Sequence, residues 1–122
     1  MGGSFDDGRP IFQQIAEMIE DDILNDTYQE GDKIYSVAQL ASIFQINPAT
    51  AVKGVTLLVD ESILYKKRGL GMFVAKNAKS IVMDKRRDRF FKKTLSYFLD
   101  EAKKIGLTDE DIIEMIKIKK GR

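Results

Sequence analysis

The sequence predicts a mainly helical α+β fold, in which short helices and one β-hairpin are followed by a two-helix C-terminal tail. Two observations support this prediction. Apolar residues recur at helical spacing through most of the chain, and the segments start at residues that suit helix N-caps. Residues 63–75 contain two short β-type runs separated by glycines, which is typical of a hairpin. The link from Asp26 to Ile34, with Gly31 in a polar turn, is a candidate for a further short strand beside this hairpin.

The first helix is expected from about Pro10 to Asn25. Its apolar residues share one face: Ile11, Phe12, Ile15, Ala16, Ile19, Ile23 and Leu24. That face indicates a scaffold helix. Its carboxylates could be read as a metal or acid-base cluster: Glu17, Glu20, Asp21 and Asp22. Neighbouring residues diverge by about 100° around a helix and no second acidic cluster is evident, so we interpret them as a solvated face.

Two helices joined by a tight turn are predicted next. Ser36 suits the N-cap of a helix from Val37 to Phe44, and Gln39 three residues later completes a capping box. After three residues of turn, Asn47 can cap a second helix that opens with Pro48 at its first position. Such a pair indicates a helix-turn-helix.

The second of these helices should end at about Asp60 or Glu61 and carry two faces. The inward candidates are Ala51, Val55 and Leu58, with Val52 and Val59 as further ones. The outward candidates, which could contact bases and phosphates, are Ala49, Thr50, Lys53 and Thr56.

The hairpin of residues 63–67 and 72–75 has the position of a wing. Its turn combines three consecutive cations with two glycines: Lys66, Lys67, Arg68, Gly69 and Gly71. Glycine permits positive φ, and cations suit phosphates. A basic turn alone is commonly just solvated, and a single Gly-x-Gly is weak evidence for nucleotide binding. Placed after two capped helices, the hairpin completes a winged helix-turn-helix, which predicts double-stranded DNA as the partner.

Several motifs between residues 10 and 75 belong together. They are residues 10–15, Gly31-Asp32-Lys33-Ile34, Ser36, Leu40-Ala41, Asn47-Pro48, Thr50 and Arg68-Gly69-x-Gly71-x-Phe73-Val74. As a set they resemble the GntR family of bacterial transcriptional regulators. The short remainder is similar to the YtrA-like subfamily, whose members carry a small helical dimerisation tail. The resemblance implies a homodimeric, operator-binding repressor.

The sequence departs from the family pattern at several positions. Tyr35 stands where the family usually has the proline of Leu-Pro-Ser, and Ala38 where arginine is common. Ala49 and Leu70 replace polar or basic residues. Either the operator differs from the usual one or binding is weak. In the first case, the residues that read the operator would be Tyr35, Thr50, Lys53 and Thr56. The full set of predicted DNA contacts also includes Ser36, Asn47, Ala49 and the wing residues named above.

Residues 80–122 predict the dimerisation region. A long helix should end before Gly106, and Thr108 with Asp111 should cap another. The apolar positions expected to pair with a second subunit are Phe91, Leu95, Phe98, Ala102, Ile105, Ile112, Ile113 and Ile116. Two such helices cannot bury this surface alone. The same stripe could instead form an effector pocket walled by Phe90, Phe91, Tyr97 and Phe98.

Charge is segregated along the 122 residues despite a net charge of +1. Residues 1–32 hold one cation and nine acidic residues. Residues 33–79 hold seven cations and two acidic residues, and residues 80–122 hold twelve cations and eight acidic residues. The basic middle coincides with the proposed reading elements, although sequence blocks need not form spatial faces. The acidic segment is expected to face away from DNA.

Other functions are disfavoured by composition. The chain has no cysteine and no histidine, so disulfides, the usual zinc ligands and the usual general base are absent. We expect no enzyme activity, no cofactor, no metal and, without an apolar run of membrane-spanning length, a cytoplasmic location. Expected divisions are residues 1–9 as a flexible terminus with a tag remnant, 10–77 as the DNA-binding domain and 78–122 as the tail. The rival hypothesis is a winged-helix protein-interaction module whose operator binding is weakened or lost.

Overall fold

The computed structural model describes residues 5, 6 and 8–121; the tag-like residues 1–4 fall outside this part. The chain divides into two compact units, Met1–Asp84 and Lys85–Arg122. The division lies within α4 (Ala78–Arg89), because Ala78 and Val82 near its start belong to the hydrophobic core of the first unit. Each unit is described separately.

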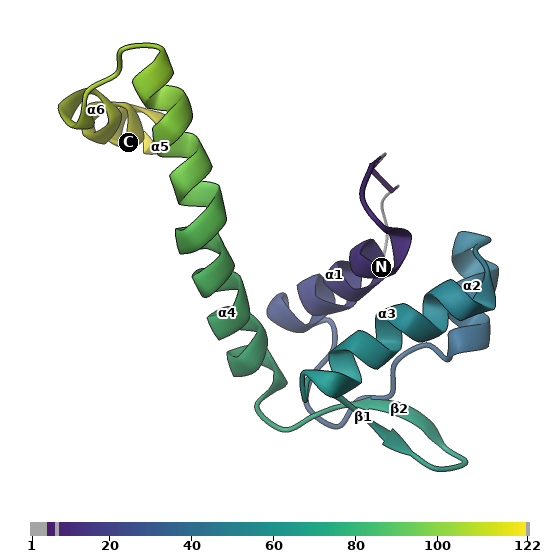
Figure 1. Cartoon of the computed structure of the whole chain (residues 1–122). Helices are drawn as coiled ribbons and strands as arrows, with labels where there is room; N and C mark the ends of the chain where they lie inside the picture. Colours follow the sequence, from purple (N-terminus) through teal and green to yellow (C-terminus); the bar gives the residue numbers. More distant parts are fainter. Residues whose placement is uncertain (1–4, 7, 122) are drawn as a thin grey trace. The chain divides into compact units, whose positions relative to one another are not determined.

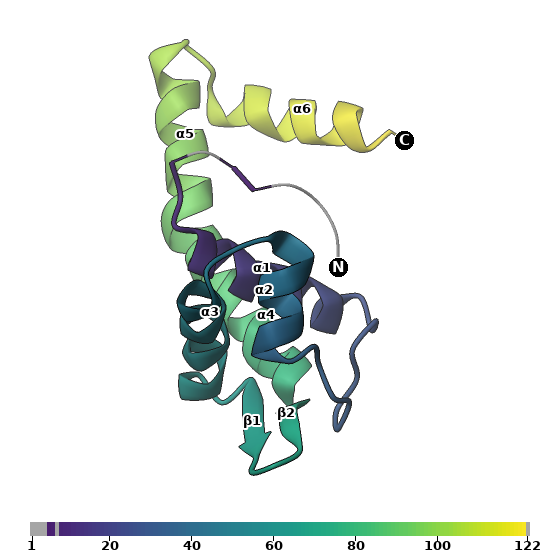
Figure 2. The ribbon, with the colours of Figure 1, turned by 90° about the vertical axis from the view of Figure 1, so that its right-hand side faces the viewer.

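The first unit is a winged helix-turn-helix, as predicted (Figure 1). Before the start of α4, its elements in chain order are α1 (Ile11–Leu24), α2 (Val37–Phe44), α3 (Pro48–Asp60), β1 (Leu64–Lys67) and β2 (Gly71–Val74). Both α1 and α2 pack against α3. The hairpin of β1 and β2 extends beyond the three helices (Figure 2). This arrangement leaves one side of α3 and the hairpin turn open to solvent.

The predicted helix caps are confirmed. At the start of α2, the Gln39 N–H donates to Ser36 Oγ over 3.1 Å, while the Ser36 N–H donates to Gln39 Oε1 over 2.8 Å. At the start of α3, Asn47 Oδ1 accepts from the Ala49 N–H over 2.8 Å, and Pro48 occupies the first helical position. Between the helices, Gln45 ends α2 in the left-handed conformation. The short turn therefore fixes α3 relative to α2.

The core of this unit is aliphatic, and most of its predicted members are buried. Two positions were predicted incorrectly. Ile11, at the first residue of α1, is 39% exposed because the neighbouring elements do not cover that end of the apolar stripe. Val52 was a further candidate for the inward face of α3, but 47% of its surface is exposed. It follows buried Ala51 by one residue, which turns it away from the core by about 100°.

The acidic face predicted on α1 is also wrong in part. Glu20 is fully buried and Asp22 nearly so, whereas Asp21 is exposed and Glu17 partly exposed. Glu20 and Asp22 both take part in interactions within the chain. Tertiary packing therefore draws two of the four carboxylates into the first unit, which the helical spacing alone could not reveal.

The hairpin strands pair antiparallel, with Tyr65 opposite Phe73 and Lys67 opposite Gly71. The segment before α2 also forms backbone hydrogen bonds with β2. The Ile34 N–H donates to the Met72 carbonyl over 3.0 Å, and the Val74 N–H donates to the Asp32 carbonyl over 2.9 Å. The loop that leads into the helix-turn-helix is therefore hydrogen-bonded to the wing.

The second unit contains the rest of α4, the π-helical segment η1 (Phe90–Thr94), α5 (Leu95–Lys104) and α6 (Asp109–Lys120). The predicted long helix is thus helical up to Lys104 but is not α-helical throughout. A π turn holds more residues than an α turn, so it changes the register of the apolar stripe on either side. Gly106 follows with φ of 78°, the left-handed conformation expected of it.

Gly54 lies inside α3 where α3 meets α1. A Cβ at this position would be 2.9 Å from the Phe12 carbonyl oxygen and 3.2 Å from Ile15 Cγ2. The Phe12 oxygen is backbone of another helix and cannot rotate away. Glycine at this position therefore sets the distance between the two helices, at a cost in helix propensity of about 1 kcal/mol relative to alanine.

We expect Gly54→Ala to lower the free energy of unfolding by about 1–2 kcal/mol, because the steric penalty of overpacking outweighs the gain in propensity. Urea denaturation followed by circular dichroism measures the change. Gln13→Ala on the exposed side of α1 is the control and should leave stability nearly unchanged. A Gly54→Ala protein more stable than the wild type would contradict the close approach of the helices.

The start of α6 makes a second prediction. Asp111 Oδ2 accepts from the Thr108 N–H over 2.9 Å, and the Asp111 N–H donates to Thr108 Oγ1 over 3.1 Å. Hydrogen bonding by the Thr108 backbone and side chain lowers the pKa of Asp111 from its ordinary value. Because the lowered pKa belongs to the folded chain, the charged cap stabilises α6 at neutral pH, and this stabilisation is lost as the pH falls through that pKa.

A carboxyl titration by NMR should therefore find that Asp111 ionises at lower pH than it would without its cap. Thr108→Ala should raise the Asp111 pKa part of the way back, since the backbone donor remains. An Asp111 pKa that does not respond to Thr108→Ala would contradict the side-chain contribution.

Candidate nucleic-acid interface

The outward side of α3 is the first part of the candidate interface. Ala49, Val52, Lys53 and Thr56 are exposed, and Thr50 is half-buried. The four exposed positions follow the i, i+3, i+4, i+7 spacing of one helix face, opposite buried Ala51, Val55 and Leu58. Three of the predicted readers, Ala49, Lys53 and Thr56, therefore share this face with Val52. Thr50 follows Ala49 by one residue and so lies about 100° around the helix from it.

A surface hollow lies on each side of this face. The hollow toward α2 and the wing has a volume of about 390 Å³ and includes Val37, Lys66 and Met72 in its wall. The hollow toward α1 has a volume of about 430 Å³ and includes Phe12 and Asp60. Val52 and Thr56 line both, so these two side chains form the ridge between them.

Lys53 is oriented by an aromatic contact. Its Nζ lies 4.2 Å from the centroid of the Phe12 ring, which is within the range of a cation–π interaction worth about 0.5–1 kcal/mol at an exposed site. The ammonium group is therefore drawn toward α1 and the edge of the α3 face, where a phosphate is a more suitable partner than a base edge.

The wing carries the second group of cations. Lys66, Lys67 and Arg68 are all exposed, and Lys67 Nζ lies 4.6 Å from the centroid of the Phe73 ring. The Tyr65 and Phe73 rings stack on the same hairpin with centroids 5.9 Å apart. The aromatic pair supports a basic hairpin tip, which is the chemistry needed to meet a phosphate backbone.

The two wing glycines are required by conformation and space. Gly69 has φ of 77° and Gly71 has φ of 126°, both in the region that favours glycine. A Cβ on Gly71 would be 2.9 Å from Lys33 Cε. Lys33 therefore crosses the wing at Gly71 and contributes a further exposed cation beside the hairpin.

Lys33 was absent from the predicted DNA contacts. Its relation to the wing depends on the pairing of residue 33 with Phe73, forty positions later in the chain. The sequence predicts a short strand in this link beside the wing, and the pairing confirms its place, but the sequence did not mark Lys33 itself as a DNA contact.

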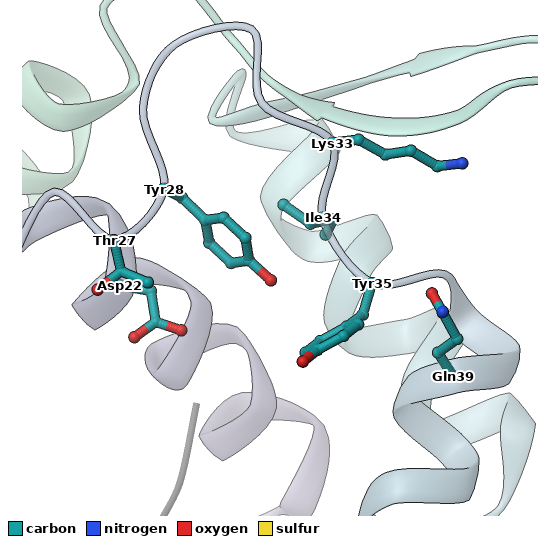
Figure 3. A pocket seen from close by; sticks show the side chains of 7 residues that line it. All are labelled: Asp22, Thr27, Tyr28, Lys33, Ile34, Tyr35 and Gln39. Atoms are coloured by element: carbon teal, nitrogen blue, oxygen red, sulfur yellow. The ribbon is translucent and has the colours of Figure 1, made fainter.

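Tyr35 lies in the wall of a separate cavity of about 440 Å³, shown in Figure 3. The other wall residues are Asp22, Thr27, Tyr28, Lys33, Ile34 and Gln39. In Figure 3 the ammonium end of Lys33 points away from Tyr28 and Asp22. Burial raises the pKa of Tyr28, and a hydrogen bond with the Tyr35 backbone opposes that rise.

Ser36 follows Tyr35 in the chain but lines the hollow between α3 and the wing. The two adjacent residues Tyr35 and Ser36 therefore border different hollows.

The predicted dimerisation residues of the second unit fall into two groups. Ala102 and Ile112 are buried within the chain, and Leu95 is half-buried. The others are exposed apolar side chains: Phe91, Phe98, Ile105, Ile113 and Ile116. The aromatic walls of the alternative effector pocket are likewise exposed, and the hollow of about 400 Å³ that includes Phe98 is lined otherwise by α6.

Among residues 5, 6 and 8–121, no three acidic residues come together in a group suited to a metal ion. In the same part of the chain, no helix combines the length and the apolar character that crossing a membrane requires.

The capped helix pair, the exposed face of α3 and the basic wing define a winged helix-turn-helix regulator. The chain belongs to the gntR family of bacterial regulatory proteins, whose family model matches residues 11–74. Members and relatives of this family are transcriptional regulators, not enzymes.

Two curated relatives come from Bacillus subtilis (strain 168). The HTH-type transcriptional regulator YhcF is 31% identical over 96% of this chain and 95% of its own length. The HTH-type transcriptional repressor YtrA is 32% identical over 88% of this chain and 82% of its own length. A GntR family transcriptional regulator from Listeria monocytogenes has a similar structure, with a TM-score of 0.74 and 31% identity over 92% of this chain and 96% of that one. These similarities support a YtrA-like member of the family.

Proposed function

We propose that this regulator is a homodimeric repressor that binds a pseudo-palindromic operator through α3 and the wing. One observation supports this proposal most directly: the outward face of α3 and the basic tip of the hairpin are both exposed in the same unit. The hydrogen bonds of Asp32 and Ile34 to β2 connect the hairpin to the helix-turn-helix. A recognition helix enters the major groove while neighbouring cations contact the phosphates. The predicted DNA contacts, together with Lys33 and Val52, include side chains for both kinds of contact, with the base edges and with the phosphates.

Dimerisation is proposed from the apolar surface of the second unit. Phe91 is 69% exposed and Ile105 73% exposed, and α6 exposes further isoleucines. Exposed apolar side chains in such number within one small unit support an interaction site. A two-fold dimer would present two copies of α3 about 34 Å apart, the spacing of successive major grooves. A second copy of the chain is therefore the expected partner.

Repression is proposed by occlusion of a promoter. The relative YtrA is named a repressor, and this chain covers most of its length. An interaction module without operator binding is the alternative, motivated by Ala38, Ala49 and Leu70.

The test of DNA binding is fluorescence anisotropy with the full chain on DNA from upstream of its own gene, against a scrambled duplex, at several salt concentrations. We expect preference for the native duplex and a steep loss of affinity with salt. Arg68→Ala should weaken binding and reduce the slope of log K against log salt by about 1, because one phosphate contact is lost.

The control is Lys79→Ala. It also removes a cation, but the Lys79 ammonium already pairs with Asp26 over 3.0 Å, so the salt slope should not change. Equal effects of the two variants would contradict a specific role for the wing, and absence of binding to both duplexes would favour the interaction module.

The test of dimerisation uses Ile116→Glu on α6, where Ile116 is 51% exposed. A carboxylate in an apolar interface is costly to bury, so the variant should sediment as a monomer at concentrations where the wild type is a dimer. Lys117→Glu, at the next and also exposed position, is the control and should remain dimeric. A monomeric wild type, or a dimeric Ile116→Glu protein, would refute pairing through this surface.

A further inference from the structure

The exposed ridge of α3 is unusually apolar for a surface that is expected to contact bases. Val52 and Thr56 form the ridge between the two hollows, and Ala49 lies on the same face about one turn before Val52 and two turns before Thr56. All three side chains carry methyl groups. Val52 exposes 47% of its surface, although a branched aliphatic side chain gains nothing from contact with water.

The hydrogen-bonding groups near this ridge are largely engaged elsewhere. Asn47 Oδ1 accepts from the Ala49 N–H as the cap of α3. Lys53 is drawn toward the Phe12 ring. Thr50 is half-buried, so Thr56 contributes the remaining hydroxyl on the ridge itself. Contact through the ridge is therefore mainly van der Waals contact.

The major-groove edges of the bases offer one apolar group, the C5 methyl of thymine. Pressing Val52 against any other base edge would desolvate polar atoms without giving them a partner. We propose that Val52, flanked by Ala49 and Thr56, reads thymine methyl groups, so that each operator half-site contains thymine beneath the centre of α3. This inference rests on the proposed DNA binding and identifies the base that the ridge selects.

The experiment starts from a duplex selected by the full-length protein from a random library. In this duplex, thymines of one half-site are replaced one at a time by uracil, which keeps base pairing and removes only the methyl group. Affinity is measured by anisotropy at constant salt. For each methyl that the ridge contacts, we expect about fourfold weaker binding, the value of burying one methyl group.

A double-mutant cycle, which combines a protein variant with the uracil substitution, assigns the contact with the methyl group to a residue. Val52→Ala removes two methyl groups from an exposed position. The variant should bind the thymine duplex more weakly than the wild type does. At one position, or at two adjacent ones, it should bind the thymine and uracil duplexes with equal affinity. Ile43→Ala, which also truncates an exposed apolar side chain but on α2, should keep every difference seen with the wild type.

The outcomes separate this inference from the proposed function. A selected duplex that binds equally well with uracil at every position would overturn methyl reading while leaving sequence-specific binding intact. Val52→Ala that retains all thymine–uracil differences would overturn the role of Val52. Failure of the library to yield any preferred sequence would refute sequence-specific binding and the inference together.

Discussion

The contact between α1 and α3 at Gly54 is the constraint on which the geometry of the exposed α3 face depends. Because Gly54 lacks a side chain, α3 can approach the Phe12 backbone and bury Ala51, Val55 and Leu58. Burial of that side determines which residues remain outside, since the faces of a helix are related by a fixed rotation. The exposure of Val52 is thus a consequence of how closely the opposite face packs.

The segment from Asp32 to Ser36 connects the helix-turn-helix to the wing. Asp32 and Ile34 form backbone hydrogen bonds with β2, Ile34 is buried in the core, and Ser36 caps α2 two residues later. A displacement of this segment would move both the helix-turn-helix and the wing. The cavity that contains Tyr35 borders the same segment, which makes its packing relevant to the reading geometry.

Local signals in the sequence were sufficient to predict the caps, helix boundaries and hairpin, because each depends on residues within a few positions of one another. Ser36 with Gln39 and Thr108 with Asp111 are examples. The sequence did not reveal the burial of Glu20 or the π-helical segment at Phe90–Thr94. The burial of Glu20 depends on contacts between segments distant in sequence, and a π turn differs from an α turn by one residue without a distinctive composition. The exposure of Val52 was missed because its apolar character suggested the core.

The position of Lys67 on the Phe73 ring affects the entropy of the wing. A free lysine side chain samples many rotamers, and fixing it costs up to about 2 kcal/mol. Contact with the ring already restricts Lys67 before any partner is present, so less rotamer freedom remains to be lost when a phosphate arrives. The stacked Tyr65 ring limits the movement of Phe73 in turn. Two aromatic residues that need not touch the nucleic acid can therefore make the hairpin a preorganised anion receptor.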